Sequence, residues 1–260
     1  MIDLNVDERG VATLALARPE KHNALSQALI DALQAAGDDI AQRGDIRVVV
    51  LTGQGPSFCA GGDLAWMRAQ MAGDAAMKTA AAQSIARMLH RLNTLPQPVI
   101  GRIHGNALGG GVGMACICDM VIAADHVKFG LTETKLGLIP ATIGPYVLAR
   151  MGEARARQVF MSGRIFDAGE AVRLGIAARA VPAGELDSAV AAEVAPYLAC
   201  APGAVAAAKA FARSLGPVID EAVIANSVDA LIAQWHSEEA EEGISAFFDR
   251  RKPAWDLTSQ

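Results

Sequence analysis

The sequence predicts an α/β fold that becomes all-helical towards its C-terminus. In the first two thirds of the chain, short apolar runs typical of buried parallel strands alternate with stretches of helical period. From residue 203 to residue 251 the pattern is helical almost throughout. A succession of strand, loop, glycine turn and helix also occurs twice, at 48–67 and at 99–118. These observations divide the chain into a core over residues 1–200 and a helical C-terminal part over residues 201–260.

The first half of the chain alternates strand and helix, with turn residues at the boundaries. Asn23 and Ser26 provide turn and N-cap residues before the first helix. The expected elements are, in order, strands at 2–6 and 11–17 that pair with each other, a helix over 27–43, a buried strand at 48–52, a loop over 53–59, a short helix from Leu64, an Ala-rich helix over 74–93 and a strand at 95–100.

The second half begins at the central glycine turn and then becomes helical. No linker of Pro, Gly and Ser precedes the last helices, so we expect them to pack on the core or on a neighbouring subunit. The expected elements are a buried helix up to Cys118, strands at 121–124 and 128–131, a loop or single helical turn over 132–140, helices near 144–151, 154–162, 167–174 and 182–200, and helix over most of 203–251.

Composition and charge describe a soluble globular protein. The 260 residues are 52% hydrophobic and 20% charged, and the net charge of −5 argues against general nucleic-acid binding. The N-terminus carries charge where a signal peptide needs an apolar core. The longest low-charge run, 106–124, is glycine-rich and contains Asp119, which favours a core segment over a membrane span. We therefore expect a cytoplasmic protein with no membrane partner.

The four cysteines do not predict a metal site. Cys116 and Cys118 lie two apart on a predicted helix and so face different directions, and neither they nor Cys59 and Cys200 have Cys or His neighbours at zinc spacing. We expect buried free thiols, which suit a reducing compartment.

Two glycine turns are candidates for binding a negatively charged oxygen. In the turn at 109–111 a helix begins on bare glycines, and its free N–H groups and dipole attract an anion. The turn does not fit a dinucleotide fingerprint, because Met114 stands where the third glycine belongs, nor a P-loop, because Gly111 and Val112 replace Lys and Ser/Thr. The alternative is that the glycines only allow tight helix packing. If this turn meets the one at 61–62, two N–H groups face one oxygen, as in an oxyanion hole.

Glu133 is the candidate acid or base. It follows a predicted strand and stands among apolar residues, which include Leu131 and Leu138. Apolar surroundings raise the pKa of a carboxyl group and suit it to proton transfer. The alternative is a solvated glutamate paired with Lys135.

Motifs along nearly the whole chain resemble the crotonase (enoyl-CoA hydratase/isomerase) family. Each motif alone is moderately specific, whereas the ordered set is highly specific. The segments that carry the resemblance are 18–25, with Arg-Pro and Asn-Ala-Leu; 58–64, FCAGGDL; 104–111, HGNALGGG; 118–119, CD; 129–140, with Phe-Gly, Glu133 and LGLIP; 163–175, with Gly-Arg and Leu-Gly; and 242–253, EGISAFFDRRKP.

This resemblance implies a spiral core of ββα units, C-terminal helices that form trimer contacts, and acyl-CoA thioester substrates. Coenzyme A is then part of the substrate, and no separate cofactor or metal is expected. The resemblance assigns the oxyanion-hole N–H groups to Gly62 and Gly110 and the catalytic carboxyl to Glu133. It also implies residues that contact CoA, and for the last three of them a solvated charge run is the alternative. These residues are Ala24, Ala60, Asp63, Leu64, Leu108, Arg250, Arg251 and Lys252.

The sequence departs from the family at one catalytic position. Hydratases of the family carry two glutamates that hold the attacking water, and the first falls on Gly113 in this chain. A side chain at 113 is expected to point towards the site, because it lies one helical turn beyond Gly110. One glutamate alone suits a double-bond isomerase, which moves a proton between two carbons.

Hydration is the favoured activity because 58–67 and 130–147 resemble bacterial methylglutaconyl-CoA hydratases and the related isohexenylglutaconyl-CoA hydratases. Their substrates carry a distal carboxylate that can take over part of the role of a missing glutamate. The resemblance therefore implies an enoyl-CoA hydratase for a branched or carboxylated acyl chain, with isomerisation as the alternative. Some relatives of the methylglutaconyl type bind RNA, but this chain has no continuous basic stripe.

Overall fold

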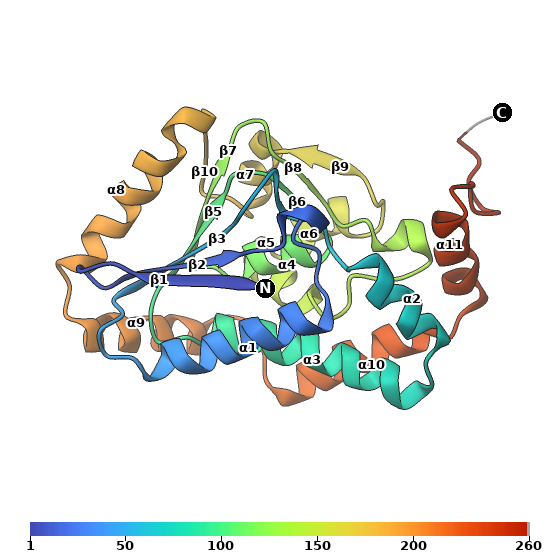
Figure 1. Ribbon diagram of the computed structural model, residues 1–260, viewed down its shortest axis with the longest axis horizontal. Helices are drawn as coiled ribbons and strands as arrows, with labels where there is room; N and C mark the ends of the chain where they lie inside the picture. Colours follow the sequence, from blue (N-terminus) through green and yellow to red (C-terminus); the bar gives the residue numbers. More distant parts are fainter. Residues whose placement is uncertain (259–260) are drawn as a thin grey trace.

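The computed structural model describes residues 1–258, which form two sheets surrounded by helices (Figure 1). The larger sheet has β1 and β2 antiparallel and all later neighbours parallel. Its strands, in sheet order, are β1 (Ile2–Val6), β2 (Val11–Leu16), β3 (Val48–Gly53), β5 (Val99–Ile103), β7 (Met120–Ala124) and β10 (Arg179–Val181). The smaller sheet consists of β4 (Ser57–Cys59), β6 (Asn106–Leu108), β8 (Lys128–Gly130) and β9 (Ile165–Asp167).

From β3 to β8, successive strands alternate between the two sheets, which confirms the spiral. The chain passes from β3 to β4, from β5 to β6 and from β7 to β8, and each step leaves the larger sheet for the smaller one. Two of the ββα units end in α2 (Leu64–Ala72) and α4 (Gly110–Cys116). Because β4 pairs in parallel with β6, the two glycine turns that follow these strands lie next to each other.

The central strands read as unbroken apolar runs because they are covered on both faces. Every residue of 48–52 is buried, as expected for a parallel strand between helical layers. Val49 pairs with Val99 of β5, and Ile100 pairs with Met120 of β7. Helix α1 (Gln27–Gln42) packs on α3 (Ala75–Asn93) below the sheet (Figure 1). Ser26 caps α1 as predicted, and its side chain accepts a hydrogen bond from Leu29 N–H.

The remaining helices follow in the order that the sequence indicates. They are α5 (Gly144–Met151), α6 (Glu153–Phe160), α7 (Ala168–Leu174), α8 (Leu186–Leu198), α9 (Pro202–Leu215), α10 (Glu221–Trp235) and α11 (Glu238–Phe248). The 3₁₀ turns are η1 (Pro19–Lys21), η2 (Glu133–Leu136) and η3 (Ala183–Glu185).

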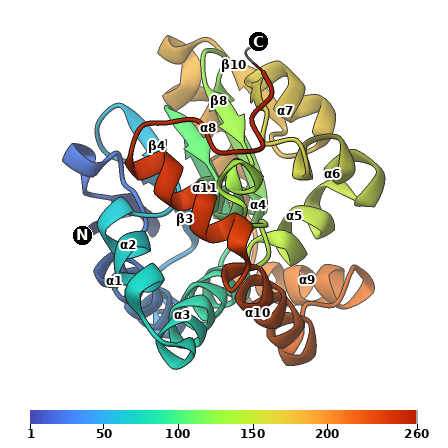
Figure 2. The ribbon, with the colours of Figure 1, turned by 90° about the vertical axis from the view of Figure 1, so that its right-hand side faces the viewer.

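The last two helices share a hydrophobic cluster with the body of the chain. Helix α10 packs on α3 and α5, and α11 packs on the turn η2. The cluster joins side chains from α3, α10 and α11, including Ala82, Trp235 and Ile244, to Leu138 just beyond η2. In the end view of Figure 2, α11 lies across this end of the molecule, with α10 below it. The assignment of residues 201–260 to subunit contacts stays a prediction.

Several sequence-based boundaries were wrong. The expected loop over 53–59 contains strand β4, the strand expected at 95–100 begins only at Val99, and the helix expected over 182–200 begins as η3 and becomes α8 at Leu186. Strands β6, β9 and β10 were not predicted at all. Each has three residues, too few for an alternating pattern to stand out, and exists because it adds to a neighbouring strand.

The cysteines differ in part from expectation. Cys59, Cys116 and Cys118 are buried free thiols, and burial raises the pKa of each to about 12. Cys200 is exposed, because the chain leaves α8 at the surface there. Cys118 also lies beyond the end of α4 and not on the helix.

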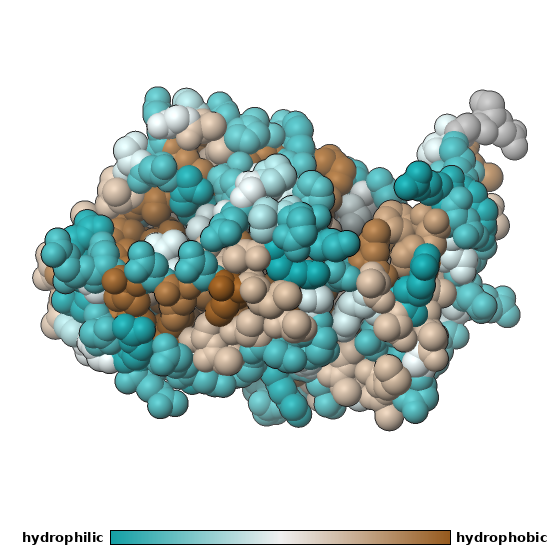
Figure 3. Space-filling model, in the orientation of Figure 1, coloured by the Kyte–Doolittle hydropathy of each residue, from teal (hydrophilic) through white to brown (hydrophobic). Residues whose placement is uncertain are grey.

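Apolar surface on the face shown in Figure 3 gathers beside the edge strand β1. Ile2, Leu4 and Val6 of this strand are half-buried against the main core. Among residues 1–258 no single helix is long and apolar enough to cross a bilayer, and one pair, 183–198 with 202–215, meets that criterion together but bends by 105°.

Candidate active site

The two glycine turns meet, as predicted. A methyl group placed on Gly109 would lie 3.7 Å from Gly61 Cα. Both glycines have positive φ, 93° at Gly61 and 48° at Gly109, which non-glycine residues rarely adopt. The turns therefore require glycine for their backbone conformation as well as for close approach, and tight packing alone does not account for them.

Leu25 connects the turns. Its N–H donates to Gly61 O at 2.7 Å and its carbonyl accepts from Asp63 N–H at 2.9 Å, so its backbone forms a bridge beside Gly62. Its side chain covers Gly110, where an added methyl group would lie 2.5 Å from Leu25 Cδ1. One residue thus fixes both glycines that the sequence singled out as oxyanion donors.

The N–H groups of Gly62 and Gly110 are available to a ligand. Within residues 1–258 neither donates a hydrogen bond to a protein acceptor. Gly110 is the first residue of α4, where N–H groups have no partner inside the helix. The flanking N–H groups of Leu25 and Asp63 are both used, whereas those of Gly62 and Gly110, the pair predicted to hold an oxyanion, are free.

Glu133 stands beside these donors. Its Oε1 would be 3.1 Å from a methyl group placed on Gly109, so the carboxyl group lies directly against the glycine turn. Its Oε2 is inaccessible to solvent and, within residues 1–258, has no hydrogen-bond partner. Burial raises the pKa of this carboxyl group to about 7, which places it near neutrality as proton transfer requires. The alternative of a solvated pair with Lys135 is wrong, because no such pair forms among the described residues.

The positions expected to contact CoA surround the same turns. Ala24 is buried and follows η1, whereas Ala60 is exposed and its N–H donates to His22 O at 3.0 Å. Leu64 begins α2 with 49% of its surface exposed, and Leu108 is half-buried at the end of β6. These backbone and apolar positions border the glycine turns, and their contact with CoA stays a prediction.

Asp63 has a structural role that the sequence reading did not include. Its carboxylate caps α2, accepting from the N–H groups of Ala65 and Trp66 at 3.0 and 3.1 Å. Arg18 donates to its other oxygen at 3.1 Å. Burial by itself would raise the pKa of Asp63, but the hydrogen bonds from Trp66 and Arg18 bring it below its ordinary value. Asp63 therefore locks Gly62 to the start of α2.

The three basic residues Arg250, Arg251 and Lys252 differ in their contacts. Arg251 is held by Glu242, with two N–O distances of 2.6 and 2.7 Å, and so fastens the tail to α11. Arg250 and Lys252 are exposed and have no ion pair within residues 1–258. Only these two are free to meet a phosphate.

At Gly113 the structure adds a constraint that the sequence does not show. A methyl group placed there would lie 2.8 Å from Ile143 Cβ, so the direction in which a side chain would leave is filled. Ile143 is 3% exposed and immediately precedes α5. The sequence reading missed Ile143, because the packing of α4 on α5 alone brings position 143 against position 113.

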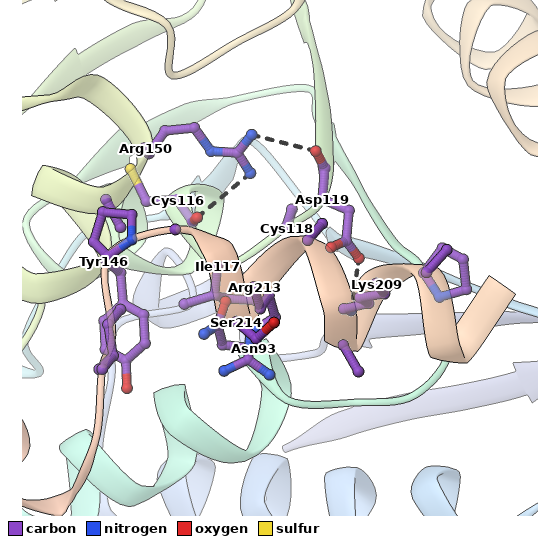
Figure 4. Close-up of a pocket in the computed structure, with 18 of the residues that line it drawn as sticks. Asn93, Cys116, Ile117, Cys118, Asp119, Tyr146, Arg150, Lys209, Arg213 and Ser214 are labelled. Atoms are coloured by element: carbon purple, nitrogen blue, oxygen red, sulfur yellow. Dashed lines mark hydrogen bonds and ion pairs between the residues drawn. The ribbon is translucent and has the colours of Figure 1, made fainter.

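One cavity of the molecule is separate from these groups. It has a volume of about 1060 Å³ and lies beside the C-terminal end of α4, between α5 and α9. Figure 4 shows the Lys209–Asp119 ion pair of 2.7 Å on its wall and Arg150 bonded to the carbonyls of Cys116 and Asp119. None of the predicted site residues lines it.

Comparisons with known proteins identify the family of this chain. A family profile described as enoyl-CoA hydratase/isomerase matches residues 7–258. The Thermus thermophilus protein named "Putative enoyl-CoA hydratase" is 33% identical over 256 residues, which cover 96% of this chain and 99% of that protein. The solved structure of a Shewanella pealeana enoyl-CoA hydratase is 34% identical with a TM-score of 0.80, covering 98% and 95% of the two chains. That of a Mycobacterium avium enoyl-CoA hydratase is 29% identical with a TM-score of 0.84, covering 98% of each. Together with the converging glycine turns and Glu133, these matches show that the chain belongs to the enoyl-CoA hydratase/isomerase family.

Proposed function

We propose that this enzyme adds water across the 2,3 double bond of an acyl-CoA thioester with a branched or carboxylated acyl chain of the methylglutaconyl type. One observation carries the proposal: the Glu133 carboxyl group, with its pKa near 7, lies against the turn whose neighbouring N–H groups are free. Such a group transfers protons next to the carbonyl that those donors would polarise.

The reaction follows from where each group stands. The thioester oxygen accepts hydrogen bonds from Gly62 and Gly110, which draws electrons from the double bond towards the carbonyl. Glu133 takes a proton from water as the water oxygen bonds to C3, and the negative charge moves onto the thioester oxygen as an enolate. Glu133 then gives the proton to C2. Each N–H donor of this kind contributes about 2.7–4 kcal/mol in measured enzymes.

The proposed class of acyl chain depends on the absence of a second carboxyl group at position 113. With Ile143 filling the space at Gly113, no protein carboxylate stands at that position to hold the water. A carboxylate on the substrate can accept the water's second hydrogen bond instead. The resemblance of 58–67 and 130–147 to methylglutaconyl-type hydratases supports this assignment.

Double-bond isomerisation is the second candidate, and Ile143 favours it. An apolar side chain in the space beside Gly113, where a second carboxyl group would stand, suits a site that moves a proton between C2 and C4 without activating water. In that reaction Glu133 removes a proton from C2 of a 3-enoyl thioester and returns it to C4, so no atom is added. A single carboxyl group is sufficient.

A panel of thioesters distinguishes the two. The enzyme is incubated in ¹⁸O-labelled water with 3-methylglutaconyl-CoA, crotonyl-CoA or a 3-enoyl-CoA, and the product masses are measured by mass spectrometry. The proposal expects labelled 3-hydroxyacyl product, formed fastest from the carboxylated substrate. If the 3-enoyl thioester is converted to a 2-enoyl thioester without ¹⁸O, and the other two substrates are not hydrated, the enzyme is an isomerase and the hydration proposal is wrong. Glu133→Gln is the inactive control.

We further propose a homotrimer or a dimer of trimers in the cytoplasm. No residue of α9 is buried, and Phe211 and Leu215 on this helix are 65% and 72% exposed. Exposed apolar side chains of this kind are expected to be buried against another subunit. Light scattering at micromolar concentration should give at least three times the chain mass of 27.0 kDa, and a monomer would contradict the proposal.

A further inference from the structure

Three buried polar atoms without partners gather at the junction of α2 and α10. They are Trp66 Nε1, Gln70 Oε1 and Trp235 Nε1, and within residues 1–258 none has a hydrogen-bond partner. The two indole rings meet edge to face, with centroids 6.4 Å apart and planes inclined by 71°. Trp66 and Gln70 are four residues apart and so share one face of α2.

The side chains around the two indole rings are largely apolar and provide no hydrogen-bond partner for these atoms within residues 1–258. Trp66 and Trp235 lie in the cluster formed by apolar residues such as Ala86, Val228 and Leu231. Burying a polar group without a hydrogen-bond partner is unfavourable, and native proteins rarely leave several such groups together. A ligand that accepts hydrogen bonds here would remove that cost.

The junction adjoins both halves of the active site. Helix α2 starts directly after the Gly62–Asp63 turn, and Trp66 lies in its first turn, where its backbone N–H donates to the capping Asp63 carboxylate at 3.1 Å. On the other side, Leu138 follows the Glu133 turn and belongs to the same cluster as Trp235. Gln234, the neighbour of Trp235, donates to Gly137 O at 2.9 Å. Figure 2 shows α2, α10 and α11 at this end of the molecule.

A cavity beside Trp235 offers space for a ligand. A cavity of about 280 Å³ borders Trp235 where the ends of α2 and α10 meet α3 and α11. Lys78 lines it and has no ion pair within residues 1–258, while Glu241 lines it as well. Because these two opposite charges offset each other, selectivity for an anion must come from the indole N–H groups, which can donate but not accept.

We propose that Trp66 and Trp235 bind the distal carboxylate of the acyl group, with Gln70 turning its amide NH₂ towards it. This inference rests on the proposed function, since it takes the ligand to be an acyl-CoA. In an extended five-carbon acyl group the far carboxyl carbon lies roughly 5 Å from the thioester carbon, given C–C bonds of about 1.5 Å. Trp66 lies in the first turn of α2, four residues after the Gly62 donor, so the far end of a glutaconyl-type chain held at Gly62 is expected near this turn.

Binding of saturated thioesters tests the subsite without any reaction. Glutaryl-CoA and valeryl-CoA have acyl chains of the same length and differ in the terminal carboxylate. Their dissociation constants are measured by calorimetry at one salt concentration. The wild type should bind glutaryl-CoA at least about tenfold more tightly, as expected for hydrogen bonds to a charged group. Equal or tighter binding of valeryl-CoA would overturn the proposal.

The variants identify the residues responsible. Trp66→Phe and Trp235→Phe keep an aromatic ring and remove only the N–H, so each should reduce the preference and the double variant should abolish it. Trp255→Phe is the matched control, because this third tryptophan is 37% exposed and lies outside the cluster. The Trp255→Phe variant should prefer glutaryl-CoA over valeryl-CoA as strongly as the wild type does. A double variant that keeps the preference would overturn the assignment.

A variant at Gln70 distinguishes loss of the subsite from a folding defect in the tryptophan variants. Gln70→Glu places a negative charge beside the indoles and should reverse the preference, so that valeryl-CoA binds better. An unchanged preference would contradict the subsite. Failure of the proposed function has a different signature: unsaturated thioesters would not be hydrated, whereas the binding ratio of the saturated pair would still be measurable.

Discussion

Ile143 occupies the space that any side chain at Gly113 would enter. A methyl group added to Gly113 would lie 2.8 Å from Ile143 Cβ, closer than real side-chain carbons approach. Both residues are buried, and the contact joins α4, which carries the Gly110 donor, to the residue before α5. The loss of a carboxylate at position 113 is thus accompanied by an apolar side chain in its place.

We expect Gly113→Glu alone to destabilise the fold, since overpacking costs about 1–3 kcal/mol. Combining it with Ile143→Gly removes the Cβ atom that the new side chain meets, so the double variant should be no less stable than Ile143→Gly alone and should show a higher rate on crotonyl-CoA relative to methylglutaconyl-CoA. Thermal unfolding and initial rates provide the two measurements, with Ile143→Gly alone as the control. A single Gly113→Glu variant as stable as the wild type would show that the site is more open than the structure indicates.

The Gly110 donor can be tested separately from its packing. Gly110→Ala should destabilise the protein because the new methyl group meets Leu25 Cδ1 at 2.5 Å, and Leu25→Ala should relieve this strain. In the Leu25→Ala background, Gly110→Ala keeps the N–H and should stay active, whereas Gly110→Pro removes it and should lower kcat by about 10²–10³-fold. Equal activity of the two double variants would place the polarising donor elsewhere.

The sequence predicted the parts of the fold that repeat over several residues. The strand at 48–52 and the helix capped by Ser26 have enough residues for their period to be clear. The three-residue strands β4 and β6 have no such period, yet their pairing brings the glycine turns together. Only the family resemblance indicated that convergence firmly.

The pH dependence of the reaction should follow Glu133. Burial raises its pKa to about 7, so below that pH the carboxyl group is protonated and cannot accept a proton from water. We expect kcat/KM for hydration to rise about tenfold per pH unit up to pH 7 and then to level off. An ordinary glutamate, with a pKa near 4.3, would give a level profile from about pH 5.5 upwards, and such a profile would contradict the assigned pKa.

Within the site, the sequence located Glu133, Gly62 and Gly110 but not the residues that support them. Leu25 was noted only as part of a motif, although its backbone and side chain fix both glycines. The partners Arg18 and Asp63 lie 45 residues apart, and Ile143 meets Gly113 only through the packing of α5 on α4. Such contacts depend on tertiary structure and leave no local pattern in the sequence.

The turnover of Glu133→Gln tests the central claim most directly. Gln keeps the size of the side chain and cannot transfer the proton, so kcat with the best enoyl-CoA should fall at least 100-fold at pH 8, within the 10²–10⁴-fold range of general acid–base catalysis. Binding of glutaryl-CoA and the melting temperature report whether the variant remains folded. A folded variant with near-normal turnover would remove Glu133 from the mechanism.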